Sequence, residues 1–227
     1  MDAVIIVNKP KGISSFGVVA RIRKITKIKK AGHAGTLDPS ATGVLVVCLE
    51  KACKRVNEFM GQDKEYEAEI VFGITTDSGD SDGTITSEKE VSLTEDELRL
   101  AVKSFVGDID QVPPMVSALH HKGQRLYELA RQGITVERPP RKVRINDIKV
   151  LSFENGKNPK AWIRVSCSKG TYIRTLCEDI GTKLGTGPYE SQLVRTRSGQ
   201  FRIDDSHTLE EIENLYNNGE LSRILIV

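Results

Sequence analysis

The stretch that decides the fold reads Gly32-His33-Ala34-Gly35-Thr36-Leu37-Asp38-Pro39-Ser40-Ala41-Thr42-Gly43-Val44-Leu45. It places one carboxylate, that of Asp38, on a short loop directly before an apolar run. Glycines at 32, 35 and 43 allow backbone conformations closed to other residues, and Pro39 disfavours a helical conformation for the residue before it. An isolated Asp-Pro pair is most often an ordinary turn. The surrounding glycines and proline indicate that the loop holds Asp38 in a defined orientation, as is expected of a catalytic acid.

The composition bounds the class of protein. A chain of 227 residues fits one large or two small domains, and we expect one continuous catalytic body. The 33 basic and 31 acidic side chains are segregated along the chain. Residues 1–60 carry 11 Lys and Arg against 4 Asp and Glu, and residues 120–202 carry 17 against 7. A fold that joins these two basic blocks would make a positive groove suited to a phosphate backbone, although solvated helix faces are the ordinary alternative.

The cysteines and the N-terminus indicate a cytoplasmic protein. Cys48, Cys53, Cys167 and Cys177 have neither the close pairing of a zinc site nor the density of a small secreted scaffold. We interpret them as reduced thiols. The apolar run at residues 3–7 is too short for a signal peptide or a membrane span.

Strands and helices alternate without repeated βαβ units, which predicts an α+β fold on a mixed sheet. In residues 64–74 strict alternation puts Tyr66 on the inward face with Ala68. Two capping boxes, Thr94 with Glu97 and Thr208 with Glu211, open helices. The expected strands are 3–7, 44–49, 64–74, 143–153, 162–168 and 192–198, and the expected helices are 15–28, 51–60, 94–105, 124–132, 171–184 and 208–216.

Motifs for a metal or a nucleotide fail on spacing. In the acidic loop at residues 77–83, aligning Gly83 to the invariant glycine of a calcium loop puts Lys89 where the bidentate acid belongs. Neither phosphate-binding glycine motif occurs. His120 and His121 are adjacent, which favours an exposed or RNA-facing loop over a metal site. We therefore expect no metal and no cofactor.

The motifs resemble those of one enzyme family, in order along residues 4–202. The Asp38 loop matches the pattern G-x-L-D-P-x-A-x-G-x-L of the TruB family of RNA pseudouridine synthases. The resemblance implies the pseudouridine-synthase fold, a mixed and largely antiparallel sheet flanked by helices and loops. The other matching segments are Asn8-Lys9-Pro10-Lys11-Gly12-Ile13-Ser14-Ser15, Lys64-Glu65-Tyr66-Glu67-Ala68 and Ser168-Lys169-Gly170-Thr171-Tyr172-Ile173-Arg174-Thr175-Leu176.

The resemblance also implies roles for single residues. Asp38 would act on the sugar, either as a nucleophile or as a base. A buried arginine needs an anionic partner, and Arg174 would orient Asp38 as its ion-pair partner. Tyr66 would stack on the target base and could take part in proton transfer. The remaining implied substrate contacts are His33, Tyr172, Leu193 and Lys9.

The implied substrate is the T-arm stem-loop of tRNA, with uridine 55 as the flipped target, and the expected protein is a monomer. Residues 1–227 would form a single catalytic domain with an RNA-gripping insertion at about 106–140 and without the family's C-terminal PUA domain. The sequence departs from the family pattern at Val116, His120 and Val194. Two alternatives stay open: a synthase acting on another RNA, and an RNA chaperone without chemistry.

Overall fold

The computed structural model describes residues 3–117 and 119–226, and they divide into two compact units. Unit 1 combines Met1–Glu67 with Gln192–Val227, and unit 2 is Ala68–Ser191. Strands β4 (Lys64–Phe72) and β12 (Pro188–Ser198) each pass from one unit into the other, and they are hydrogen-bonded neighbours. The predicted mixed, largely antiparallel sheet is confirmed. The single catalytic domain stays a prediction.

Unit 1 is built around strand β3 (Thr42–Leu49), the apolar run after the Asp38 loop. β3 pairs antiparallel with β1 (Ala3–Lys9) and with β2 (Ala31–His33). It pairs parallel with β12, where Arg195 lies opposite Gly43. Strand β13 (Phe201–Arg202) adds to β12. The short strand β2 and the extra residues of β3 and β12 were not predicted.

The apolar runs of β1 and β3 are explained by burial on both faces. Ile5, Val7, Leu45 and Val47 pack on one face with α1 (Ser15–Thr26), while the alternate residues face a second cluster that includes Phe59. Strands buried on both sides need no polar alternation. This is why the sequence shows continuous apolar runs where an exposed sheet would alternate.

Helices α1 and α6 (Leu209–Asn217) of unit 1 begin at capping residues, and the cap of α6 is the predicted one. Ser14 Oγ accepts a hydrogen bond from Gly17 N at 3.0 Å at the start of α1, and the Thr208–Glu211 capping box opens α6. The helix expected at 51–60 is a 3₁₀ turn, Glu50–Arg55, followed by α2 (Val56–Met60). Further 3₁₀ turns are Ile203–Asp205 and Leu221–Ile224.

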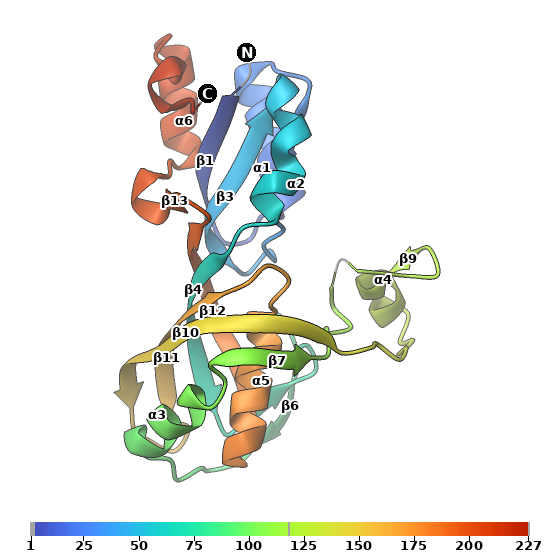
Figure 1. Cartoon of the computed structure of the whole chain (residues 1–227), viewed down its shortest axis with the longest axis vertical. Coiled ribbons are helices and arrows are strands. Elements are labelled where there is room, and N and C mark those ends of the chain that lie inside the picture. Colours follow the sequence, from blue (N-terminus) through green and yellow to red (C-terminus); the bar gives the residue numbers. More distant parts are fainter. Residues whose placement is uncertain (1–2, 118, 227) are drawn as a thin grey trace. The chain divides into compact units, whose positions relative to one another are not determined.

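Unit 2 is a second layered structure (Figure 1). The long strand β10 (Arg141–Glu154) pairs antiparallel with β11 (Lys160–Cys167) and with β7 (Gly107–Gln111). Helix α3 (Glu95–Lys103), opened by the predicted Thr94 capping box, packs against β10 and against α5 (Ile173–Leu184). Two small hairpins complete the unit: β5 (Ile74–Thr76) with β6 (Ile85–Glu88), and β8 (His120–His121) with β9 (Gln124–Arg125).

Two predicted elements of unit 2 end differently. The strand expected to reach Ile74 stops at Phe72, because Gly73 has a φ of +84° and a Cβ there would meet the Lys89 carbonyl oxygen at 2.4 Å. The helix expected at 124–132 is α4 (Leu126–Arg131), since the first two residues pair in the hairpin instead. The expected insertion at 106–140 contains β7, this hairpin and α4, and its residue 118 lies outside the described residues. Within residues 3–117 and 119–226, no helix combines the length and the apolarity that crossing a membrane requires.

We predict that Ile22→Ala destabilises the protein by about 2–5 kcal/mol, because Ile22 is fully buried between α1 and the sheet. Denaturant unfolding followed by circular dichroism measures the change. Leu100→Ala on α3 is the control, since Leu100 is 73% exposed and its loss should change stability by less than about 0.5 kcal/mol. Equal effects of the two substitutions would contradict the assignment of this core.

Candidate functional site

The Asp38 loop connects β2 to β3 in unit 1, and Asp38 itself is exposed on it. Gly35 and Gly43 both have a φ of +98°, so both use the conformational freedom that the sequence predicted for them. A Cβ on Gly43 would meet the backbone oxygen of Arg195 at 2.3 Å. Glycine at 43 therefore lets β12 approach β3 directly behind the loop.

The residues on either side of Asp38 are held by the segment that leads into α1. The buried Ser15 hydroxyl accepts a hydrogen bond from Leu37 N at 2.8 Å and donates to Leu37 O at 3.0 Å. Gly12 N donates to Pro39 O at 2.8 Å. The loop is thus fixed immediately before and immediately after its carboxylate.

Lys9 supports the same loop from inside the protein. Its side chain is 0% exposed, and its ammonium donates to the carbonyl oxygens of Pro10, Ile13 and Pro39 at 3.0, 2.7 and 3.2 Å. A buried cation is tolerated when such oxygens replace its water shell. This placement gives Lys9 a role in positioning the loop, whereas its expected contact with substrate stays a prediction.

Arg195 is the loop-supporting residue to which the sequence interpretation gave no role. It is 1% exposed, and its guanidinium donates to the carbonyl oxygens of Val44 at 2.7 Å, Gly35 at 3.2 Å and Thr36 at 3.4 Å. Its fork of five N–H donors suits several acceptors at once. The available signal was an arginine within a strand-like segment near the C-terminal end, with a second arginine, Arg197, two residues on.

His33 lies at the end of β2, next to this arginine. Burial lowers the pKa of His33 below its ordinary value of 6.5, and the positive charge of Arg195 lowers it further, while a hydrogen bond with the Gly35 backbone acts in the opposite direction. The imidazole is therefore held neutral near pH 7. A neutral ring beside the Asp38 loop can pack against a base without adding charge.

Two more expected pocket residues belong to unit 1. Tyr66 is in β4 and Leu193 is in β12, and both are half-buried. The Leu193 carbonyl oxygen accepts a hydrogen bond from Thr42 Oγ1 at 3.5 Å, at the start of β3. Unit 1 thus contains Asp38, His33, Tyr66, Leu193 and Lys9.

Tyr172 and Arg174 belong to unit 2, at the start of α5. Arg174 is buried, and its guanidinium lies 2.9 Å from the carboxylate of the equally buried Asp80. Arg174 Nη1 also donates to Ser78 O at 3.2 Å. Sequence reasoning expected an anionic partner for this arginine but did not find Asp80. The expected ion pair between Arg174 and Asp38 stays a prediction.

Asp80 is itself fixed by the acidic loop that resembled a calcium site. Ser78 Oγ donates to its carboxylate at 2.6 Å, and Asp82 N donates to it at 3.1 Å. Glu190 N of β12 donates to Gly79 O at 3.0 Å, which ties this loop to the sheet. The acidic loop is therefore a support for Arg174.

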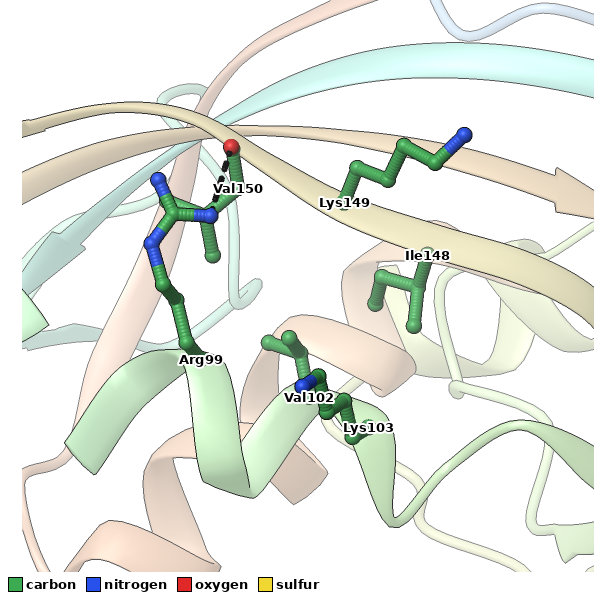
Figure 2. Close-up of a pocket in the computed structure, with 6 residues that line it drawn as sticks. All are labelled: Arg99, Val102, Lys103, Ile148, Lys149 and Val150. Carbon is green, nitrogen blue, oxygen red and sulfur yellow. Dashed lines mark hydrogen bonds between the residues drawn. The ribbon is translucent and has the colours of Figure 1, made fainter. Parts of the chain in front are cut away.

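Unit 2 also contains a hollow between α3 and β10 (Figure 2). Arg99 spans it, with Nη1 donating to Val150 O at 3.3 Å. The expected site residues do not line it, so it is separate from the candidate chemistry. Its lining residues are Arg99, Val102, Lys103, Ile148, Lys149 and Val150.

Two family models match this chain, and both describe pseudouridylate synthases, a class of RNA-modifying enzymes. Residues 23–173 match the family model described as TruB family pseudouridylate synthase (N terminal domain). Residues 174–226 match that of the tRNA pseudouridylate synthase B C-terminal domain. The chain belongs to the TruB family.

Its curated relatives are similar over nearly the whole chain. The tRNA pseudouridine synthase B of Pelotomaculum thermopropionicum is 49% identical over 232 residues, covering 100% of this chain and 72% of that protein. The protein of the same name from Clostridium tetani is 49% identical, covering 93% of this chain and 73% of its own length.

A solved structure shows the same fold. In the Cbf5-Nop10-Gar1 complex, the matching chain has a TM-score of 0.78 at 33% identity. The match covers 99% of this chain and 59% of that chain, so the present sequence spans less than two thirds of the solved relative.

We predict a pH-dependent contribution of His33 to stability. Because its folded pKa is lowered, the unfolded chain takes up this proton first as the pH falls below about 6.5. The contribution is therefore fully present above pH 6.5 and is lost as the pH falls towards and through the folded pKa. Denaturant unfolding between pH 8 and pH 5 should show a smaller loss of stability for His33→Gln than for wild type. Identical pH profiles would contradict the prediction.

We predict that Asp80→Asn destabilises unit 2 by about 3–5 kcal/mol, because it leaves the buried Arg174 guanidinium without this anionic partner. Thermal or denaturant unfolding measures the change. Asp82→Asn, an exposed carboxylate two residues away, is the matched control and should have little effect. If both variants unfold like wild type, the ion pair contributes nothing measurable.

Proposed function

We propose that this pseudouridine synthase acts on uridine 55 in the T loop of tRNA, with Asp38 as the catalytic carboxylate. The observation that carries the assignment of Asp38 is the way its loop is held. The carboxylate is exposed, yet Lys9, Ser15 and Arg195 bind the loop backbone from the buried side. A group that must act on a substrate has to be both accessible and fixed.

The reaction explains this requirement. Pseudouridine formation breaks the N1–C1′ bond of uridine, turns the freed uracil and joins C5 to C1′. The nucleotide must first leave the stack, because its reacting atoms are otherwise shielded. Asp38 acts on the exposed sugar, either attacking C1′ or removing a sugar proton, and both roles require an ionised carboxylate in a fixed position.

The other expected residues complete the pocket in this proposal. Tyr66 stacks on the flipped base, as aromatic rings do with unpaired bases, and His33 and Leu193 shape the space beside the Asp38 loop. From unit 2, Tyr172 adds a pocket wall and Arg174 orients Asp38. Lys9, being buried, acts through the loop backbone.

The T-arm assignment rests on the relatives, which are named tRNA pseudouridine synthase B. Two basic blocks of the sequence, residues 1–60 and 120–202, fit a phosphate backbone. Cys48, Cys53, Cys167 and Cys177 form no disulfide within the described residues, which fits the cytoplasm. We further propose that the protein acts as a monomer.

We predict that Asp38→Asn slows tritium release from tRNA labelled at uracil C5 by on the order of 10⁴-fold or more, because the amide can neither attack nor accept a proton. The tRNA is an unmodified transcript, and its affinity for the variant should stay close to that of wild type. Asp204→Asn, an exposed carboxylate elsewhere in unit 1, is the control and should release tritium at the wild-type rate.

Three outcomes would decide against parts of the proposal. Equal release by Asp38→Asn and wild type would remove Asp38 from the chemistry. Binding of tRNA without release by wild type would favour a chaperone. Wild-type release from a ribosomal RNA fragment but not from a minimal T-arm hairpin would favour a different target RNA.

A further inference from the structure

Gln111 is the last residue of β7, and its side chain is 2% exposed. Its side-chain amide makes two hydrogen bonds with the backbone of one residue, Tyr172, donating one and accepting the other. Tyr172 N donates to Gln111 Oε1 at 2.8 Å, and Gln111 Nε2 donates to Tyr172 O at 3.0 Å. A side-chain amide has both a donor and an acceptor. Gln111 therefore binds Tyr172 as the backbone of a neighbouring strand would.

The residue held in this way begins the helix that carries Arg174. Tyr172 is the N-cap residue of α5, with an extended backbone at φ −99° and ψ 110°, and its side chain makes no capping hydrogen bond. The first N–H groups of a helix lack partners within the helix. The Gln111 amide thus fixes the backbone where a side-chain cap is absent, two residues before Arg174.

The segment that follows Gln111 leads to the long strand β10. Residues 112–140 contain the β8–β9 hairpin and α4 before the chain enters β10. At the far end of this segment, the positive charge of Arg138 opposes the rise that burial causes in the pKa of Glu178 on α5. Arg174 acts on Glu178 in the same direction. The start of segment 112–140 is therefore bonded to the start of α5, through the Gln111 amide.

We propose that Gln111 is a positioning residue for pseudouridine formation, which sets the backbone of Tyr172 and ties segment 112–140 to the start of α5. Through this one buried amide, Gln111 holds the backbone from which the side chains of Tyr172 and, two residues later, Arg174 project. This inference rests on the proposed function, because it assigns Tyr172 to the pocket.

The test compares Gln111→Met, which removes both hydrogen bonds at similar size, with Gln111→Glu, which keeps an acceptor and loses the amide donor. Single-turnover tritium release at saturating tRNA gives the rate, filter binding gives the affinity, and circular dichroism gives the midpoint of unfolding. We expect both variants to release tritium at least about tenfold more slowly, while their affinity for tRNA stays within about twofold of wild type. Gln200→Met, an exposed glutamine in unit 1, should match wild type in all three measurements.

The split between rate and affinity separates positioning from a merely structural role. A folded variant with wild-type rate would overturn the proposal, and so would weaker binding with an unchanged rate. If Gln111→Met does not fold, the nearly isosteric Gln111→Glu decides alone. Failure of the proposed function is distinguishable, because wild type would then release no tritium.

Discussion

The candidate site depends on one buried guanidinium. Arg195 enters unit 1 on β12 and donates to three carbonyl oxygens at the two ends of the Asp38 loop. It can reach them because β12 runs parallel to β3 with Arg195 opposite Gly43, where any side chain would collide with the Arg195 backbone. Gly43 in β3 and Arg195 in β12 therefore depend on each other: the glycine allows the close approach of β12, and the arginine uses that approach to reach the loop. Without either, the loop that exposes Asp38 would lose this part of its support, leaving the contacts from Lys9, Ser15 and Gly12.

The same solution recurs at other turns of unit 1. Lys9 and Lys64 are both buried, and each directs its ammonium at carbonyl oxygens of a nearby turn. Turn carbonyls that point into the protein have no strand or helix partner, and leaving such groups unsatisfied is costly. A long cationic side chain can reach several of them from one position. This explains why Lys9, one of the expected substrate contacts, is buried in the protein.

Sequence patterns predicted the elements where periodicity and caps were strong. The apolar runs of β1 and β3 and both capping boxes gave the correct elements within a few residues, and the helix expected at 15–28 is α1, which ends at Thr26. Short pieces such as β2 and the β8–β9 hairpin were missed, because two or three residues carry no period. The end of β4 was misplaced because Gly73 turns the chain for a reason, the approach of Lys89, that only the tertiary structure shows.

The chemistry expected of the site residues stays a prediction, and the sequence did not identify the groups that hold them. A buried arginine at the start of α5 required an acid, and the structure supplies Asp80. The sequence could not identify Asp80, because a buried arginine requires a negatively charged partner but does not determine which acidic residue the fold places beside it. The same limit applies to Gln111. A side-chain amide can pair with the backbone N–H and C=O of any residue, so the sequence does not show that this one pairs with Tyr172. Motifs therefore indicate which groups are candidates to face a substrate, whereas the groups that hold those candidates in place follow from long-range packing.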